Sequence, residues 1–198
     1  AKLRMLNGAH SALAYIGLGR GHELVHQAIA DPAIRPLIDR LMREEAAPTI
    51  DAAPGQDLAA YADALLDRFA NPAFHHPLIQ IAMDGSQKIP QRWLETLAWH
   101  QKRGARCPAL ETAIAAWIAF LRSDHPLDDP LAEQLREAAT GPDAMERLFE
   151  KGGLKPKIDP KTRDDIWLKL WGNLCFNPIS ALTHATLDVV ATDPGTRA

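Results

Sequence analysis

Three polar side chains near the start of the chain have the types and spacing for acid–base chemistry on an alcohol. Lys2, Asn7 and His10 fall in one expected helix, where residues three apart and about two turns apart share a face. A lysine whose pKa is lowered by burial can remove an alcohol proton. An amide can stabilise the oxyanion that develops, and a histidine can orient a substrate hydroxyl. Solvated polar residues at a helix end have the same spacing, so the pattern suggests a site without establishing it.

A second polar block runs from Asp84 to Arg92, with the sequence DGSQKIPQR. We expect a tight polar turn between apolar helices, which presents a carboxylate, a hydroxyl and cations on one short loop. Asp84, Ser86, Lys88 and Arg92 are therefore candidate substrate ligands. The alternative is a solvated connector between two helices.

The run His22-Glu23-Leu24-Val25-His26 matches the zinc-protease motif literally. Two histidines at i and i+4 of a helix can share a zinc ion, with the glutamate as general base. Glu44 or Glu45 could supply a third ligand. The expected helix ends by Asp31, one turn after His26, so a zinc metallohydrolase is the less favoured alternative.

A further polar set lies towards the other end of the sequence. Lys169, Asn173 and Asn177 step at i, i+4 and i+8 among bulky apolar residues, which places them on one helix face. A lysine and two amides buried together are costly unless they bind something. The alternative is a lysine whose ammonium group reaches solvent from the helix edge.

Composition excludes several classes of protein. The 198 residues carry a formal net charge of -3 without a basic stripe, which argues against a nucleic-acid partner. Cys107 and Cys175 make no disulfide framework, which is typical of a reducing cytoplasm. No apolar run approaches the ~20 residues that span a bilayer, and no signal peptide is recognised. We predict a cytoplasmic protein with no membrane partner.

The apolar residues repeat with a helical period, and no segment alternates as a strand does, so we predict an all-α fold. Helices are expected at about 3–19, 22–30, 31–42, 56–69, 79–83, 90–102, 110–121, 131–139, 144–150 and 162–187. The residues expected in the core are Leu13, Ile16, Leu37, Leu41, Leu65, Phe69, Ile79, Leu97, Trp117, Phe120, Trp171 and Leu182.

A Gly/Pro/Lys-rich connector at 152–160 is the best candidate domain boundary. It divides the chain into 1–149 and 150–198, which we expect to pack as one domain. If the apolar helix after the connector finds no partner face on the first segment, its exposed patch favours a homodimer.

The first 139 residues or so resemble the C-terminal domain of the mannitol dehydrogenase family, long-chain polyol dehydrogenases that need no metal. The resemblance is carried by Lys-x4-Asn-x2-His, the following SALAYIG, Ala30-Asp31-Pro32 and the block Ile81–Arg92. It implies a multi-helix domain like those of 6-phosphogluconate-dehydrogenase-like oxidoreductases.

The same resemblance implies roles for individual residues. Lys2 would be the general acid/base, Asn7 the stabiliser of the alkoxide and His10 a substrate ligand, and Lys88 matches a second lysine of the substrate site. Mannitol-specific members have an arginine where this chain has Gln80. With Met83, this departure resembles fructuronate reductases (mannonate dehydrogenases) and implies a sugar-acid substrate, with Arg92 or Lys88 for its carboxylate.

From about residue 150 the sequence resembles the start of the helical domain of ketopantoate reductases. Their catalytic lysine and two asparagines fall on Lys169, Asn173 and Asn177. Together the two resemblances imply a chimera of two related helical domains.

Both families bind NAD or NADP mainly through a Rossmann domain that precedes the helical one. The run Gly17-Leu18-Gly19-Arg20-Gly21 follows a helix and not a strand, so it does not replace that domain. We therefore expect the substrate-binding, catalytic helical domain of a sugar-acid or polyol oxidoreductase, inactive without a Rossmann partner. The alternative is a recombined or engineered helical protein without activity.

Overall fold

The computed structural model describes residues 1–141, 144, 147 and 148. These residues are helical, and the β pairing among them is a single antiparallel bridge between Leu24 and Pro77, which confirms the predicted all-α class. None of the described helices is long and apolar enough to cross a bilayer. In chain order the elements are η1 (Lys2–Asn7), α1 (Gly8–Gly19), α2 (Val25–Ala30), α3 (Arg35–Arg40), η2 (Leu41–Ala46), η3 (Ala47–Thr49), α4 (Leu58–Ala70), α5 (Leu78–Ala82), α6 (Gly85–Ile89), η4 (Pro90–Leu94), α7 (Glu95–Gln101), α8 (Pro108–Arg122) and α9 (Ala132–Ala139).

Helix α1 is the central element of the described part. Apart from His10, every residue from Gly8 to Gly17 is buried, as expected of a helix that is apolar on all sides. It contacts α2, α5 and α8. Gly17 permits this packing, because a Cβ there would lie 2.7 Å from Cδ1 of Leu78 and 2.9 Å from Cβ of Ala28.

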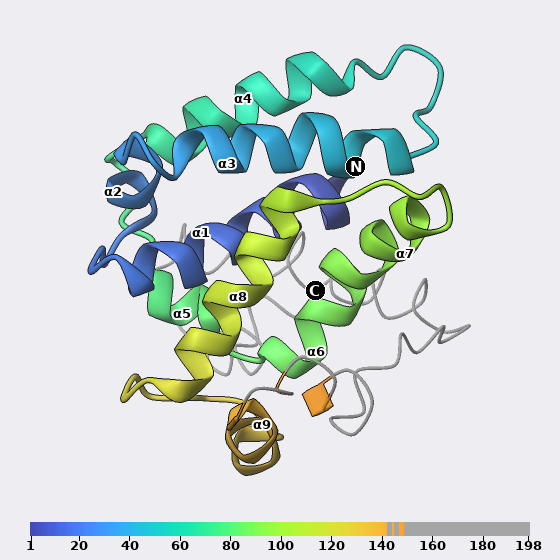
Figure 1. Ribbon diagram of the computed structural model, residues 1–198. Coiled ribbons are helices and arrows are strands. Elements are labelled where there is room, and N and C mark those ends of the chain that lie inside the picture. Colours follow the sequence, from blue (N-terminus) through green and yellow to red (C-terminus); the bar gives the residue numbers. More distant parts are fainter. Residues whose placement is uncertain (142–143, 145–146, 149–198) are drawn as a thin grey trace, which may run out of the picture. The chain divides into compact units, whose positions relative to one another are not determined.

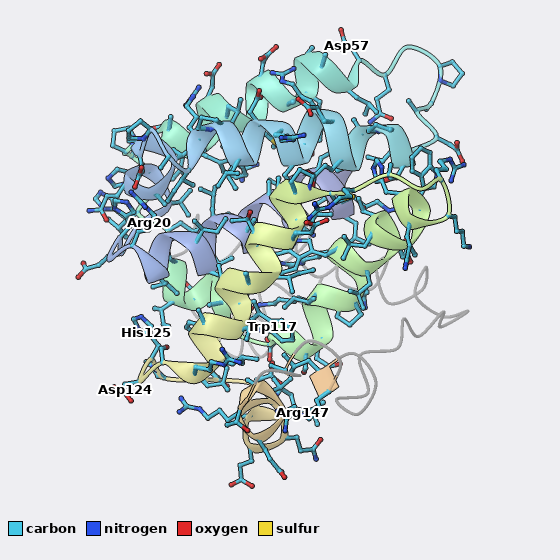
Figure 2. All side chains as sticks on the ribbon, in the orientation of Figure 1. Arg20, Asp57, Trp117, Asp124, His125 and Arg147 are labelled. Atoms are coloured by element: carbon cyan, nitrogen blue, oxygen red, sulfur yellow. The ribbon has the colours of Figure 1, made fainter. Side chains whose placement is uncertain are left out.

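Other helices pack around α1. In Figure 1, the stretch from α3 through η2 runs alongside α4, and α8 crosses in front of α1. Asp57 caps α4, with its carboxylate accepting hydrogen bonds from the backbone N–H groups of Ala59 and Ala60. Figure 2 shows Trp117 inside the described helices and Asp57 at their edge.

The predicted core is largely confirmed. Leu37, Ile79 and Leu97 are only half-buried, because the buried stripes of their helices run through neighbouring positions such as Ile34, Ile38 and Leu78. Trp171 and Leu182 lie outside the described residues. The predicted core residues that are buried are Leu13, Ile16, Leu41, Leu65, Phe69, Trp117 and Phe120.

Two predicted boundaries were wrong. The polar block that begins at Asp84 was expected to form a short loop before the helix at 90–102, but one residue makes the turn. Asp84 has a left-handed backbone (φ 55°), and α6 begins directly after it. The helix predicted from His22 begins only at Val25, because residues 23–25 pair with the segment that precedes α5.

A buried carboxylate fixes the start of α8. Glu45, in η2, is 2% exposed, and its two carboxylate oxygens accept hydrogen bonds from the N–H groups of Ala109 (2.8 Å) and Leu110 (2.9 Å). The free N–H groups and the dipole at a helix N-terminus favour a negative charge there. The carbonyl oxygen of Glu45 also bonds Nε2 of His100 in α7, at 2.8 Å. One residue therefore joins three helices.

Replacing this carboxylate should destabilise the domain. We expect Glu45→Ala to lower the free energy of unfolding by about 2–3 kcal/mol, because two buried N–H groups lose their acceptor. The substitution Glu44→Ala, at the neighbouring position, removes only an exposed ion pair with Arg40. It should change the free energy of unfolding by less than about 0.5 kcal/mol. Urea unfolding of the two variants measures the difference, and equal effects would contradict the capping role.

Candidate functional site

A pocket of about 130 Å³ opens beside the start of α1. It contains two of the three residues that the first motif predicted, Asn7 and His10. The remaining lining comes from η1, α2, α4 and the loop between α4 and α5. The residues that line it are Leu6, Asn7, His10, Val25, Arg68, Phe69, Phe74 and His76.

The first motif depends on a π-helical turn. In an α-helix, two residues five apart point about 140° away from each other, since the helix has 3.6 residues per turn. Residues 2–7 instead form the π-helix η1, and the N–H of Gly8 bonds the carbonyl oxygen of Leu3, five residues back. Residues five apart are linked by the backbone hydrogen bond of a π-helix, which brings Lys2 closer to the face of Asn7 than an α-helix would. Lys2 itself is exposed and is not part of the pocket lining.

Two side chains from η4 hold the junction between η1 and α1. Arg92 donates to Oγ of Ser11 at 2.6 Å and to the carbonyl oxygen of Asn7 at 3.4 Å, and Trp93 Nε1 donates to the carbonyl oxygen of Gly8 at 3.1 Å. Burial lowers the pKa of the Arg92 guanidinium. The structure therefore gives Arg92, predicted as a substrate ligand, contacts that hold Asn7 in place.

His10 is a neutral ring in positive surroundings. Its ring stacks on Phe69, with centroids 5.3 Å apart and planes inclined by 16°, and meets His76 edge-on at 4.8 Å. The pKa of His10 is lowered to about 3, mainly by burial and in addition by the charges of His76, Arg92, Arg68 and Lys88. A neutral imidazole can donate one hydrogen bond and accept another, which suits the orientation of a hydroxyl group.

The block after Asp84 contributes to the fold more than to the pocket lining. Ser86 is buried, and its N–H and Oγ donate to the carboxylate of Asp129 at 2.8 and 2.6 Å. Lys88 Nζ donates to the carbonyl oxygen of Met83 at 2.5 Å and lies 3.8 Å from the carboxylate of Asp84. Of the four candidate ligands in this block, none lines the pocket, although Lys88 and Arg92 act on His10 through their charge.

Comparison with known proteins identifies the family. The sequence model described as "Mannitol dehydrogenase C-terminal domain" matches residues 1–149. The chain belongs to this family. The D-mannonate oxidoreductase of Escherichia coli is 45% identical over 119 residues, which are 60% of this chain and 24% of that enzyme. The mannitol 2-dehydrogenase of Phaeosphaeria nodorum is 36% identical over 170 residues, 83% of this chain and 29% of that enzyme.

A solved structure has the same fold. The structure of Pseudomonas fluorescens mannitol 2-dehydrogenase, in a ternary complex with NAD and D-mannitol, matches with a TM-score of 0.73 at 27% identity. The match covers 92% of this chain and 39% of the other. The chain thus spans about a quarter to a third of the length of the curated relatives given above.

The likeness to mannitol dehydrogenases continues beyond residue 149. Residues 1–149 are three quarters of the chain, whereas the P. nodorum enzyme matches 83% of it. The comparisons therefore do not support a ketopantoate reductase segment or a chimera. Lys169, Asn173 and Asn177 lie outside the described residues, as does the predicted boundary at 152–160, and both stay predictions.

The structure of this mannitol dehydrogenase domain gives the zinc alternative no support. His22 Nε2 lies 3.0 Å from the carboxylate of Asp31, which also accepts from Arg20, and the ring of His26 lies edge-on to His75. Among the residues that the structure describes, no three histidine, cysteine or acidic side chains are grouped to hold a metal ion.

Sequence reasoning missed Arg68, Phe74 and His76. Arg68 has the pattern of an ordinary charged residue in the last turn of an amphipathic helix, and the other two lie in what reads as a connector. No local signal distinguishes them. They reach the pocket because residues 76–78 pair with 23–25, through Val25 N to His76 O (3.1 Å) and Leu78 N to Glu23 O (2.8 Å).

The His10 pKa can be measured directly by NMR. We expect its ring signals not to titrate between pH 8 and pH 5, where a solvated histidine does. The unfolded chain takes up this proton below about pH 6.5 and the folded one only near pH 3, so the free energy of unfolding should fall as the pH decreases between these values. Titration of His10 near pH 6.5 would contradict the buried, positive environment.

Gly85 should be essential to the turn that carries Lys88 and Arg92. A Cβ at this position would lie 2.8 Å from the Tyr15 hydroxyl, which donates to the carbonyl oxygen of Ala82, and 3.0 Å from Nε1 of Trp117. We expect Gly85→Ala to lower the free energy of unfolding by about 1–3 kcal/mol. Gly19→Ala meets nothing in the described part of the chain within 4 Å and serves as the control, with no loss of stability expected. Thermal unfolding distinguishes them.

Proposed function

We propose that this chain is the substrate-binding and catalytic domain of a nicotinamide-dependent oxidoreductase that acts on sugar acids. The observation that carries the proposal is the convergence of Asn7 and His10 on one pocket, with Lys2 brought to the face of Asn7 by η1. The D-mannonate oxidoreductase among its relatives is consistent with a substrate that carries a carboxylate.

Lys2, Asn7 and His10 each have one role in the interconversion of a carbonyl group and an alcohol. The cofactor, when bound, supplies the hydride that reduces the carbonyl carbon. The Lys2 ammonium group donates a proton to the carbonyl oxygen as negative charge develops there, and in the reverse direction its amine removes the alcohol proton. The Asn7 amide donates a hydrogen bond to the same oxygen, and His10 orients a neighbouring hydroxyl.

The polar side chains at this site are of the types that a hydride transfer with a nicotinamide cofactor requires, namely a proton donor and hydrogen-bond donors. The amide of Asn7 and the neutral imidazole of His10 line the pocket together with Leu6 and Val25, and Lys2 lies outside this lining. We propose that NAD or NADP is held mainly by a Rossmann domain that partners this one. The P. fluorescens mannitol 2-dehydrogenase, which has the same fold over this domain, was solved with NAD bound.

Positive charge supports a sugar acid over a neutral polyol. Among the described residues no carboxylate lines the pocket, and Lys88, Arg92 and Arg68 all add to the positive charge that acts on His10. An anionic substrate is attracted by such a field. Gln80, at the position where the resemblance places an arginine in mannitol-specific members, supports the same substrate class. A cytoplasmic location and a homodimer stay predictions.

A segment exchange tests the proposal. Residues 1–149 of this chain would replace the matching segment of the E. coli D-mannonate oxidoreductase. We expect the hybrid to reduce D-fructuronate in preference to D-fructose, measured as consumption of the reduced cofactor. Lys2→Met should lower kcat by about 10²-fold or more, because general acid–base catalysis is lost.

The matched control is Lys102→Met, which replaces an exposed lysine at the end of α7 and should leave kcat unchanged. Full activity of the Lys2→Met hybrid would contradict the role of Lys2. A clear preference of the hybrid for D-fructose would contradict the sugar-acid assignment.

A further inference from the structure

Arg68 is the charged side chain that lines the pocket together with Asn7 and His10. It lies in the last turn of α4, next to Phe69, whose ring stacks on His10. Its guanidinium carbon lies 6.0 Å from the centre of the Phe74 ring. Phe74 also lines the pocket and is 55% exposed, which is unusual for a large apolar side chain in the described part of the chain.

Arg68 differs from the neighbouring arginines in its partners. Arg43 pairs with Asp39 and Asp63, and Arg20 pairs with Asp31. Within the described residues, no carboxylate lies within ion-pair distance of Arg68. The guanidinium edge therefore has N–H donors available for a ligand, in the fork geometry that matches a carboxylate.

The other cations near the pocket are held by protein atoms. Arg92 donates to Ser11 and to the backbone of Asn7, and Lys88 donates to the backbone of Met83 and lies beside Asp84. These bonds direct Arg92 towards η1 and α1, which carry the motif, and Lys88 towards the end of α5. Arg68 is thus the cation whose contacts leave it best placed for a ligand at the pocket.

Electrostatics favours an anion at this place. Arg68, Arg92 and Lys88 all act on His10 with the same sign, and the described residues of the pocket lining include no acidic side chain to balance them. A carboxylate bound here gains from each of these charges. A neutral polyol gains much less, since it offers the field no net charge.

We infer that Arg68 binds the carboxylate of an acyclic sugar acid at this pocket, with Phe74 packed against the guanidinium, and so selects sugar acids over neutral polyols. The inference rests on the proposed function and specifies its substrate contact. It transfers carboxylate recognition from Arg92 and Lys88, which the sequence favoured, to a residue of α4. Arg92 and Lys88 contribute through their field.

The test measures direct binding to the full chain, without a cofactor or turnover. D-mannonate and D-mannitol are titrated into the chain, and the His10 and Phe74 NMR signals give the two dissociation constants. We expect tighter binding of D-mannonate than of D-mannitol. Arg68→Met should weaken D-mannonate binding by about tenfold or more, since a charge-assisted hydrogen-bonded pair is lost, and should leave D-mannitol binding unchanged.

Arg103→Met is the matched control. Arg103 also stacks on an aromatic ring, 3.7 Å from the centre of Trp99, but it does not line the pocket. The control variant should bind D-mannonate as the unchanged chain does. Thermal unfolding checks that both variants fold, which is expected because Arg68 and Arg103 are exposed.

Three results would overturn the inference. Unchanged D-mannonate binding by Arg68→Met would show that another group holds the carboxylate. An equal loss for both ligands would show a structural role for Arg68. Equal dissociation constants of the unchanged chain for D-mannonate and D-mannitol would contradict the proposed selectivity for sugar acids. If the segment exchange nevertheless gives Lys2-dependent turnover of D-fructuronate, the inference alone fails and the proposed function stands.

Discussion

The geometry of the site depends on the junction between η1 and α1. At Asn7 and Gly8 the backbone changes from π- to α-helical hydrogen bonding, and Arg92 and Trp93 bond the carbonyl oxygens of these two residues. The residues that form this clamp are 85 positions apart in the chain, so the motif acquires its shape only when η4 packs on η1. Without it, α-helical geometry would direct Lys2 and Asn7 away from each other. The half-buried Arg92 and the buried Trp93 thus hold the backbone that carries the candidate catalytic groups.

Two buried carboxylates position the helices around this junction. Glu45 caps α8, which packs on α1, and Asp129 accepts from Ser86 in the first turn of α6, which continues into η4. Each carboxylate accepts backbone N–H groups that a helix start leaves without an intrahelical partner, so the cost of burying the charge is offset. These two buried carboxylates therefore satisfy the first N–H groups of α8 and α6.

The sequence allowed the all-α class and most helix positions to be predicted, because helical periodicity reports burial on one face and needs no knowledge of the partner. The sequence also predicted Asn7 and His10 as site residues, but from a spacing argument that was only partly correct. The spacing argument assumed an α-helix, whereas the π-helical turn that aligns Lys2 with Asn7 has no signal in residue types. Ser86 was predicted as a substrate ligand, but it is buried and donates to Asp129. The sequence around Ser86 is the same for an exposed polar turn and for a buried hydroxyl, so only the position of Asp129 distinguishes them.

Contacts between distant segments account for what the sequence could not show at the pocket. Arg68 and Phe74 come to it through the packing of α4 on α2 and the pairing of 76–78 with 23–25. The positive charge at the site likewise comes from residues of several helices, so no single sequence motif predicts it. Family resemblance supplied roles for Lys2, Asn7 and His10, but it gave no indication of Arg68.

The loop between α4 and α5 is held at both ends. The side chain of Asn71 accepts from the N–H of Ala73 at 2.9 Å, and the bridge between Leu24 and Pro77 fixes the far end. Phe74 lies between these anchors with more than half of its surface exposed. Side-chain rotation of exposed residues takes picoseconds to nanoseconds, far faster than the opening of a backbone loop. We expect ligand exchange at this pocket to require only the rotation of one ring, so the backbone stays in place while molecules enter and leave.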